Sequence, residues 1–189
     1  KNQMNWLSTA YVSTVNTSGL YRIFPMDQTI LDTTRRYALK IAKDTDRDYW
    51  VEFRQKYNAD YRWFKDGVVL NWSPWGQSLD SSVVGSNSGG QFLDTTPGSA
   101  DGKNDGPVVI GRTFSDRESS IHITPVGKGG TTPESMDVMV NVGDFPTNNA
   151  PVINTLSADT TTPAVNGTVN FTVDATDVDG DTLAYFWDF

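Results

Sequence analysis

The chain has 189 residues, a single histidine and no cysteine, and its formal net charge at pH 7 is −8. Without cysteine it can form neither a disulfide nor a Cys-ligated zinc or iron–sulfur site. An acidic chain has no broad positive field to attract phosphate backbones, so nucleic acid is not expected as a partner. Because no run of about 18 apolar residues occurs, the sequence predicts no membrane-spanning segment.

Short segments with a two-residue period, separated by glycine and proline, recur through most of the chain. The segment that begins at Tyr49 reads Tyr-Trp-Val-Glu-Phe, and alternation turns its odd-numbered residues to one face and Trp50 and Glu52 to the other. Residues 136–142 alternate as expected of a strand with one buried face. Further strands are expected at 37–43, 68–70, 108–110 and 121–126. Since no capped apolar pattern has helical spacing, the sequence predicts an all-β fold whose first domain is a jelly-roll-like β-sandwich.

The distribution of charge marks a domain boundary. Residues 148–189 contain six aspartates and no lysine or arginine, whereas the preceding residues carry all 15 basic residues and 17 of the 23 acidic ones. The change coincides with a polar linker that begins at Pro146 and ends at Pro151. We therefore expect a β-sandwich domain over residues 1–147 and a second, truncated domain over residues 148–189.

The second segment contains two strand-like stretches, 169–173 and 183–187, joined by an acidic loop at 174–181. With 42 residues it is too short for a complete immunoglobulin-like sandwich, which needs about 100. We expect a partial immunoglobulin-like sandwich. Its open edge strand would pair with strands of other molecules unless another domain or chain covers it.

Three motifs in this segment carry a resemblance to a known family. They are Asn-Asn-Ala-Pro-Val-Ile at 148–153, Asp-Val-Asp-Gly-Asp-Thr-Leu at 177–183 and Tyr-Phe-Trp-Asp-Phe at 185–189. Together they resemble the first half of a PKD domain, whose hallmark is Tyr-x-Trp-Asp-Phe followed by Gly-Asp-Gly. The Gly-Asp-Gly would lie beyond Phe189. The resemblance implies that the partial sandwich is the start of a PKD module.

A second resemblance concerns the first domain. It is carried by Ser-Gly-Leu-Tyr-Arg-Ile at 18–23, Tyr-Trp-Val-Glu-Phe-Arg at 49–54, Leu-Asp-Thr-Thr-Pro-Gly at 93–98, Gly-Arg-Thr-Phe-Ser-Asp at 111–116 and Ile-His-Ile at 121–123. These residues resemble the region after the catalytic domain in secreted bacterial metallopeptidases of the gametolysin and immune-inhibitor-A type. In such proteins the β-rich region follows a zinc-binding helix and precedes PKD modules. Since no apolar leader opens the chain at Lys1, we expect a piece of a longer precursor.

The single histidine, His122, cannot form a zincin site within this chain. Such a site needs His-Glu-x-x-His on one helix, because two imidazoles four residues apart converge on one zinc ion. As the base of a Ser-His-Asp triad, His122 would need an oriented serine and carboxylate, which sequence alone does not show. We interpret His122 as a strand-face histidine with an ordinary partner, and predict no catalytic residue and no zinc here. A hydrolase with an unrecognised carboxylate pair is a weaker alternative.

The acidic loop at 174–181 is a candidate calcium site, because calcium takes six to eight oxygen ligands and carboxylates on a glycine-containing turn supply them. Some PKD-like domains bind calcium through two aspartates of this turn and the entry linker. Carried over, the resemblance implies ligands among five residues: Asn148, Asn149, Asp177, Asp179 and Asp181. The alternative is a solvated Asp-Gly hairpin. A second oxygen-rich stretch, 94–106, is interpreted as a surface loop.

Aromatic residues concentrate between Tyr49 and Trp75, and four tryptophans are candidates for substrate binding: Trp50, Trp63, Trp72 and Trp75. Exposed rings would stack on sugars or grip a fibrous protein, because they offer a large rigid area. Buried rings would instead belong to the sandwich core, and this interpretation is favoured.

These observations predict a non-catalytic accessory region of a secreted, extracellular metallopeptidase. It would support the catalytic domain of the parent protein and assist the binding of protein substrate by raising its effective concentration. The alternative is a carbohydrate- or collagen-binding β-sandwich module that uses surface aromatics. An exposed patch of the four tryptophans would favour the alternative.

Overall fold

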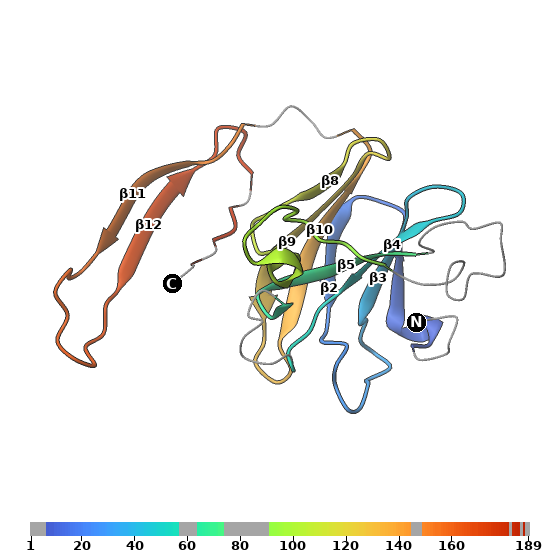
Figure 1. Cartoon of the computed structure of the whole chain (residues 1–189), viewed down its shortest axis with the longest axis horizontal. Coiled ribbons are helices and arrows are strands. Elements are labelled where there is room, and N and C mark those ends of the chain that lie inside the picture. Colours follow the sequence, from blue (N-terminus) through green and yellow to red (C-terminus); the bar gives the residue numbers. More distant parts are fainter. Residues whose placement is uncertain are drawn as a thin grey trace. The chain divides into compact units, whose positions relative to one another are not determined.

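The computed structural model describes residues 7–56, 64–73, 91–144, 149–181, 183–185 and 187. The chain is all-β, as the sequence predicted, and it forms several sheets (Figure 1). It divides into two compact units, one of Lys1–Phe145 with Tyr185–Phe189 and one of Pro146–Ala184. The helices of the described part are short 3₁₀ turns, such as Thr9–Tyr11 and Gly102–Asp105, and none of them is long and apolar enough to cross a membrane.

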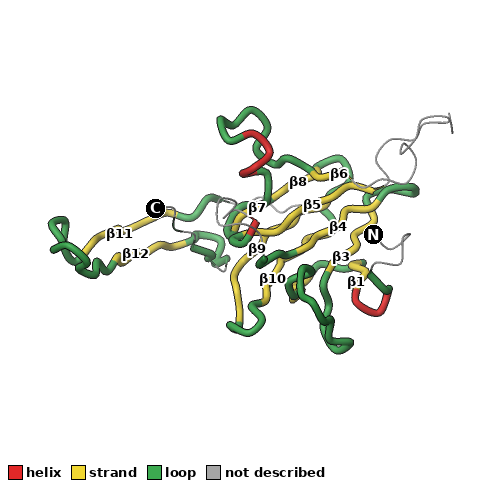
Figure 2. Tube along the Cα trace, turned by 60° about the horizontal axis from the view of Figure 1, so that its bottom comes forward, coloured by secondary structure: helices red, strands yellow, loops and turns green. Residues whose placement is uncertain are grey.

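The first sheet of the first unit has the strand order β1-β3-β4-β5-β6, and β7 also pairs with β5. Figure 2 shows β3, β4 and β5 side by side. The strands are β1 (Val12–Val15), β3 (Ala38–Ala42), β4 (Asp48–Glu52), β5 (Gly67–Ser73), β6 (Gln91–Phe92) and β7 (Val108–Val109). All pairs are antiparallel except β1 with β3, which is parallel. The sequence did not predict this parallel pair, because β1 has no clear alternation.

The second sheet has the order β2-β10-β9-β8 and is antiparallel throughout. Its strands are β2 (Gly19–Ile23), β8 (Phe114–Asp116), β9 (Ile121–Gly129) and β10 (Ser135–Val142). A bulge interrupts the β9–β10 pairing between Asp137 and Val138. The segments expected at 121–126 and 136–142 therefore form neighbouring strands, and β2 joins them from far away in the sequence.

The core lies between these two sheets and draws apolar residues from both. The alternation predicted for β4 is confirmed, because Tyr49, Val51 and the following Phe53 are buried in one cluster with residues of β9 and β10. Trp50 turns to the other face, where it packs half-buried against a smaller cluster around Tyr37. Glu52 shares that face.

Glu52 is unexpectedly buried for a carboxylate at the end of an amphipathic strand. Only 4% of the residue is exposed, and its oxygens accept hydrogen bonds from Arg54 at 2.9 Å and from Asn71 at 2.9 Å. Buried carboxylates are tolerated when they are paired in this way. Arg54 is a local neighbour of Glu52 in the sequence, but Asn71 reaches it only through the pairing of β4 with β5, which the sequence does not reveal.

The second unit contains one antiparallel pair, β11 (Val152–Ala158) and β12 (Phe171–Thr176), with a bulge between Ile153 and Thr155. Its register places Ile153, Leu156 and Phe171 on one apolar face, on which these side chains remain 63%, 60% and 47% exposed. The opposite face carries threonine, serine and aspartate, with Val152 at one end. The unit thus has the amphipathic pattern of one half of a sandwich.

The strand predicted at 183–187 is not present among the described residues of that segment. Leu183 to Tyr185 and Trp187 have no strand assignment, whereas the stretch at 169–173 does form part of β12. An alternating pattern becomes a strand only where a neighbouring strand satisfies its backbone. In the described part of this unit, β12 pairs with β11 alone.

Candidate functional site

An open cleft of about 510 Å³ lies on the first unit, between two turns that belong to different sheets. One wall is the β3–β4 turn with Lys43 and Arg47, and the other is β8 with the residues that follow Asp116. Trp72, near the end of β5, and Tyr49, from β4, complete the lining between them. The cleft is therefore built where both sheets end, and charged and aromatic side chains line it together.

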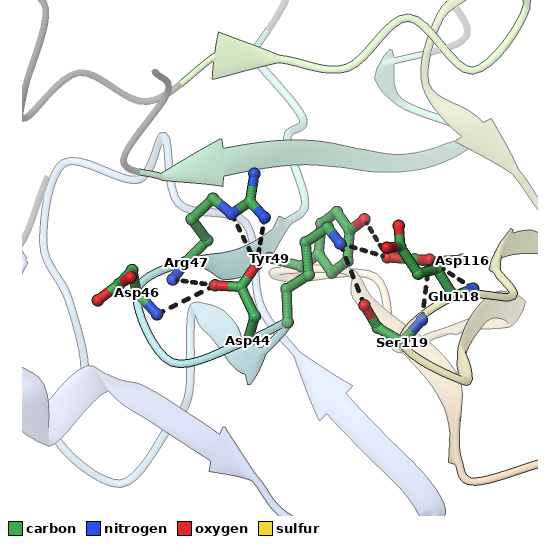
Figure 3. A network of polar contacts seen from close by, with 8 residues as sticks. Asp44, Asp46, Arg47, Tyr49, Asp116, Glu118 and Ser119 are labelled. Atoms are coloured by element: carbon green, nitrogen blue, oxygen red, sulfur yellow. Dashed lines mark hydrogen bonds and ion pairs between the residues drawn. The ribbon is translucent and has the colours of Figure 1, made fainter. Parts of the chain in front are cut away.

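Asp116 connects the two walls (Figure 3). Its carboxylate accepts hydrogen bonds from the Tyr49 hydroxyl at 2.8 Å and from the backbone N–H groups of Glu118 and Ser119 at 3.0 and 3.1 Å. The Lys43 ammonium lies 3.1 Å from the same carboxylate and donates to the Ser119 hydroxyl at 3.1 Å. The Lys43 and Asp116 side chains are only 8% and 11% exposed. This ion pair is therefore largely removed from solvent.

The protonation states of this group are fixed at neutral pH. Burial alone would raise the pKa of Asp116, but hydrogen bonds from Tyr49, Ser119 and Lys43 outweigh it and lower the pKa to about 2. Burial, and then the hydrogen bond to the Asp116 carboxylate, raise the pKa of the Tyr49 hydroxyl well above its usual value. Asp116 is consequently ionised and Tyr49 protonated across the physiological range.

The β3–β4 turn is stabilised by its own aspartate, which presents Arg47 to the cleft (Figure 3). The Asp44 carboxylate accepts hydrogen bonds from the backbone N–H groups of Asp46 at 3.0 Å and Arg47 at 2.8 Å. Such side-chain-to-backbone bonds are why aspartate favours turns. The Arg47 guanidinium also donates to Asp44 at 2.6 Å, and mainly this hydrogen bond lowers the pKa of Asp44.

Trp72 forms the aromatic surface of the cleft. The Arg47 guanidinium lies 4.8 Å from the centre of its ring and the Lys43 ammonium 5.5 Å, both within the range of cation–π attraction. Tyr49 packs on the same indole with ring centres 6.3 Å apart, and Phe114 packs edge-on against Tyr49 at 5.4 Å. The half-buried Trp72 ring is thus held by aromatic neighbours and flanked by two cations.

Two exposed charges remain at the edge of the cleft, on the turn between β8 and β9. Within the described part of the chain, Arg117 and Glu118 form no ion pair, whereas Lys43 is paired with Asp116 and Arg47 with Asp44. A ligand would therefore meet an aromatic ring flanked by one available charge of each sign. This chemistry suits the binding of a molecule that is itself partly apolar and partly charged.

His122 lies on β9 opposite Ser115 of β8, and its Nδ1 is 2.9 Å from the Ser115 hydroxyl. The histidine is only 3% exposed, and it does not line the cleft. Burial, together with the positive charge of Arg117, lowers the pKa of His122 below its usual value. The geometry is that of a cross-strand pair on an antiparallel sheet.

Of the four candidate tryptophans, the two that the structure describes, Trp50 and Trp72, do not share one surface. Trp63 and Trp75 lie outside the described residues. Trp72 pairs across strands with Tyr49, and Trp50 pairs with Asn71, so the two described tryptophans project from opposite faces of the same sheet. Only Trp72 lines the cleft, while Trp50 packs against the smaller apolar cluster with Lys40 5.8 Å from its ring.

Of the calcium candidates, Asn148 lies outside the described residues, and the others are close together in the second unit. Asn149 donates from its backbone to Asp179 at 2.7 Å and from its side-chain amide at 3.2 Å. Asp177 accepts from the backbone N–H groups of Asp179 at 2.8 Å and Asp181 at 3.5 Å. These hydrogen bonds thus join Asn149 to Asp179. The side-chain amide of Asn149 turns its nitrogen toward the Asp179 carboxylate, whereas calcium would bind the amide oxygen.

The second oxygen-rich stretch, 94–106, forms hydrogen bonds within itself. Asp94 accepts from the Thr96 backbone at 3.0 Å, and Ser99 donates to Asp105 at 2.8 Å. Throughout the described residues, no group of three or more histidine, aspartate or glutamate side chains is arranged to hold a metal ion. The interpretation of this stretch as a surface loop stays a prediction.

No protein-family model, curated protein or solved structure matches this chain. The candidate site is therefore assigned from its geometry alone. Sequence reasoning selected Trp72 but missed Lys43, Arg47 and Asp116. A signal was present, because Asp44 lies just after β3 and Asp116 is the last residue of β8, and polar turn residues follow each of them. Nothing in the sequence indicated that these two turns meet.

Proposed function

We propose that this chain is a non-catalytic accessory region of a secreted metallopeptidase, in which the cleft on the first unit holds protein substrate near the catalytic domain of the parent protein. The resemblance of the motifs at 18–23, 49–54 and 111–116 supports the parent family and its extracellular location. The cleft supports the binding role, because it presents an aromatic ring together with charged groups.

The observation that carries a binding role over a catalytic one is the protonation behaviour of the cleft. General acid–base catalysis works best with a group whose pKa lies near the working pH. Asp116, with a pKa of about 2, is a weak base, and Tyr49, with its raised pKa, is a weak acid. They are also hydrogen-bonded to each other, and Asp116 is paired with Lys43. They therefore hold the walls of the cleft together and are poorly suited to transferring protons.

An extended polypeptide fits the remaining groups of the cleft. Such a chain carries apolar side chains for the ring of Trp72 and charged side chains for Arg117 and Glu118 at the edge. Weak binding at this position is sufficient for an accessory role, because attachment to an enzyme converts it into a high effective concentration of substrate.

A retention assay on immobilised denatured collagen and on immobilised casein tests this function. We expect the complete chain to be retained, and the Trp72→Ala variant to bind at least about tenfold more weakly, because buried aromatic anchors dominate binding energy. Trp50→Ala is the matched control: this tryptophan is also half-buried beside a cation but lies on the opposite face. Its retention should equal that of the unaltered chain, with thermal melting confirming that both variants fold.

The proposal would be contradicted if the two tryptophan variants were retained equally. It would also be contradicted if the unaltered chain were retained on neither denatured collagen nor casein. The parent family is tested separately by sequencing the reading frame upstream of Lys1. A segment encoding His-Glu-x-x-His there would support a metallopeptidase parent.

The alternative function is a carbohydrate- or collagen-binding module. The observation that favours it is Trp72, since an indole at an open cleft can stack on a sugar ring. However, Arg47 lies over that ring and would have to move before a sugar could stack. Retention on insoluble cellulose or native collagen, lost in Trp72→Ala and absent on denatured protein, would establish this alternative instead.

We also propose that the second unit binds calcium through Asn149, Asp177, Asp179 and Asp181. The proximity of Asn149 to Asp179 supports the site, and rotation of the amide would bring its oxygen to the ion. We expect millimolar calcium to raise the melting temperature, because an ion that binds only the folded state stabilises it. Asp179→Asn should abolish this shift, whereas Asp137→Asn in the first unit should retain it. An unchanged melting temperature in calcium would refute the site.

A further inference from the structure

The loop between β11 and β12 contains the one Asn-Gly dipeptide of the sequence, Asn166-Gly167. Asn166 has a positive φ of 63°, the left-handed conformation that asparagine adopts more readily than other residues with side chains. The turn is closed by a hydrogen bond from the Gly167 N–H to the Ala164 carbonyl at 2.8 Å. Both residues are exposed, so water reaches the dipeptide from outside the hairpin.

The side chain of Asn166 differs from the other asparagines of this hairpin. Asn154 donates from its amide to Asp174 at 3.0 Å, and Asn170 donates to Asp159 at 2.6 Å. These bonds fix both amides against a carboxylate. Within the described residues 149–181, the amide of Asn166 makes no such hydrogen bond. It is therefore free to rotate toward the backbone of the residue that follows it.

We propose that Asn166 is a site of spontaneous deamidation. In this reaction the backbone nitrogen of Gly167 bonds to the Asn166 side-chain carbonyl carbon, and the Cγ–Nδ2 bond breaks with release of ammonia. The proton from the Gly167 nitrogen leaves with the ammonia, and a five-membered succinimide remains. Water then opens either carbonyl of the ring and gives aspartate or isoaspartate. No oxidant, reductant or enzyme is needed.

The residue after Asn166 determines how easily the ring closes. Glycine has no Cβ to obstruct the approach of its nitrogen to the asparagine side chain, and its backbone adopts unusual angles freely. Asn154 and Asn170 are instead followed by Thr155 and Phe171, and both lie in or beside paired strands. The turn hydrogen bond of Gly167 must open before ring closure, and such openings are frequent in exposed loops.

Deamidation at this position has two consequences for the molecule. It adds a negative charge to a segment that already contains six aspartates and no basic residue over residues 148–189. It also removes the asparagine of Asn166-Gly167-Thr168, which is an acceptor sequence for N-glycosylation. Purified protein should therefore become more acidic with storage, in a discrete step of one charge.

The test is incubation of the complete folded chain in mildly alkaline buffer prepared with ¹⁸O-labelled water, followed by proteolysis and mass spectrometry. We expect Asn166 to convert at least about tenfold faster than Asn154 or Asn170, a ratio that a modest difference in activation barrier produces. The products should be both aspartate and isoaspartate, each with one ¹⁸O atom. The Asn166→Gln variant should show no conversion at residue 166, and its melting temperature should be only slightly lower, because glutamine adopts the left-handed conformation of this position less readily than asparagine.

A synthetic peptide with the sequence of residues 160–170 separates the effect of the fold from that of the dipeptide. We expect the folded chain to deamidate at a rate within about threefold of the peptide, because an exposed turn gives little protection. Conversion of Asn166 no faster than that of Asn170, or conversion in the peptide alone, would overturn the proposal.

Discussion

Replacing Asp116 with alanine is expected to destabilise the first unit by about 3–5 kcal/mol, because it leaves the Lys43 charge without its partner in a site largely shielded from water. The same change removes the acceptor of the Tyr49 hydroxyl and of two backbone N–H groups. Denaturant unfolding of the complete chain, followed by tryptophan fluorescence, measures the loss.

Two further variants separate the charge from the hydrogen bonds. Lys43→Met combined with Asp116→Asn should recover part of the lost stability, since the buried pair is then replaced by an apolar group and a neutral acceptor. The matched control is Asp137→Asn, which breaks the exposed ion pair with Arg22 at 2.7 Å. Surface pairs contribute little, so its unfolding midpoint should hardly move. If the unfolding midpoint of Asp116→Ala lay as close to that of the unaltered chain as the midpoint of Asp137→Asn does, the role of Asp116 would be refuted.

The pH dependence of stability gives an independent measure of the same group. The pKa of Asp116 is lowered to about 2 in the folded chain, so the folded state favours the ionised carboxylate. Its contribution, about 2 kcal/mol, is fully present above the unfolded pKa of about 4 and is lost as the pH falls toward 2. In Asp116→Asn, the free energy of unfolding should therefore fall by about 2 kcal/mol less on acidification from pH 4 to pH 2 than it does in the unaltered chain. An unchanged fall would contradict the pKa assignment.

Gly67→Ala is expected to destabilise the first unit by about 3 kcal/mol through overpacking against backbone. Gly67 opens β5 and pairs with Val109 of β7. A Cβ at this position would lie 2.3 Å from the Val108 carbonyl oxygen and 2.8 Å from the Val109 Cα. Because both atoms belong to a neighbouring strand, a change of rotamer cannot relieve the contact, and β7 would have to move away from β5.

The control for this variant is Gly127→Ala in β9. A Cβ at Gly127 meets no atom within 4 Å, so the substitution should alter stability by no more than about 0.5 kcal/mol. Thermal or denaturant unfolding of the two variants makes the comparison. If the two substitutions lowered the free energy of unfolding equally, the loss would be due to replacing glycine within a strand and not to the close approach of β7 to Gly67.

Much of the fold was predictable because several strands carry their pattern locally. The alternation at β4 and β10 follows from one buried face, and both segments form strands close to the expected bounds. The strand expected at 183–187 was wrong for its described residues, since pairing and not pattern decides whether a strand forms. The parallel contact of β1 with β3 also depends on tertiary pairing.

The candidate site was harder to predict, because its residues come from turns of separate sheets. Asp116 and Lys43 are far apart in the sequence, and neither belongs to a motif with characteristic spacing. Trp72 was identified as an aromatic candidate, but the sequence could not separate it from Trp50. Strand register makes this distinction, since it places the two rings on opposite faces.

The pairing of β2 with β10 has a consequence for how the chain folds during synthesis. Ile23 faces Met136 in this pair, so β2 leaves the ribosome long before its partner exists. At about 5–20 residues per second, synthesis of the chain from Ile23 to Met136 takes roughly 6–23 seconds. During that time the backbone of β2 and Ile23, which is buried in the folded unit, are open to other chains. Pairing between strands so distant in the sequence slows folding and prolongs the time for which β2 has no partner.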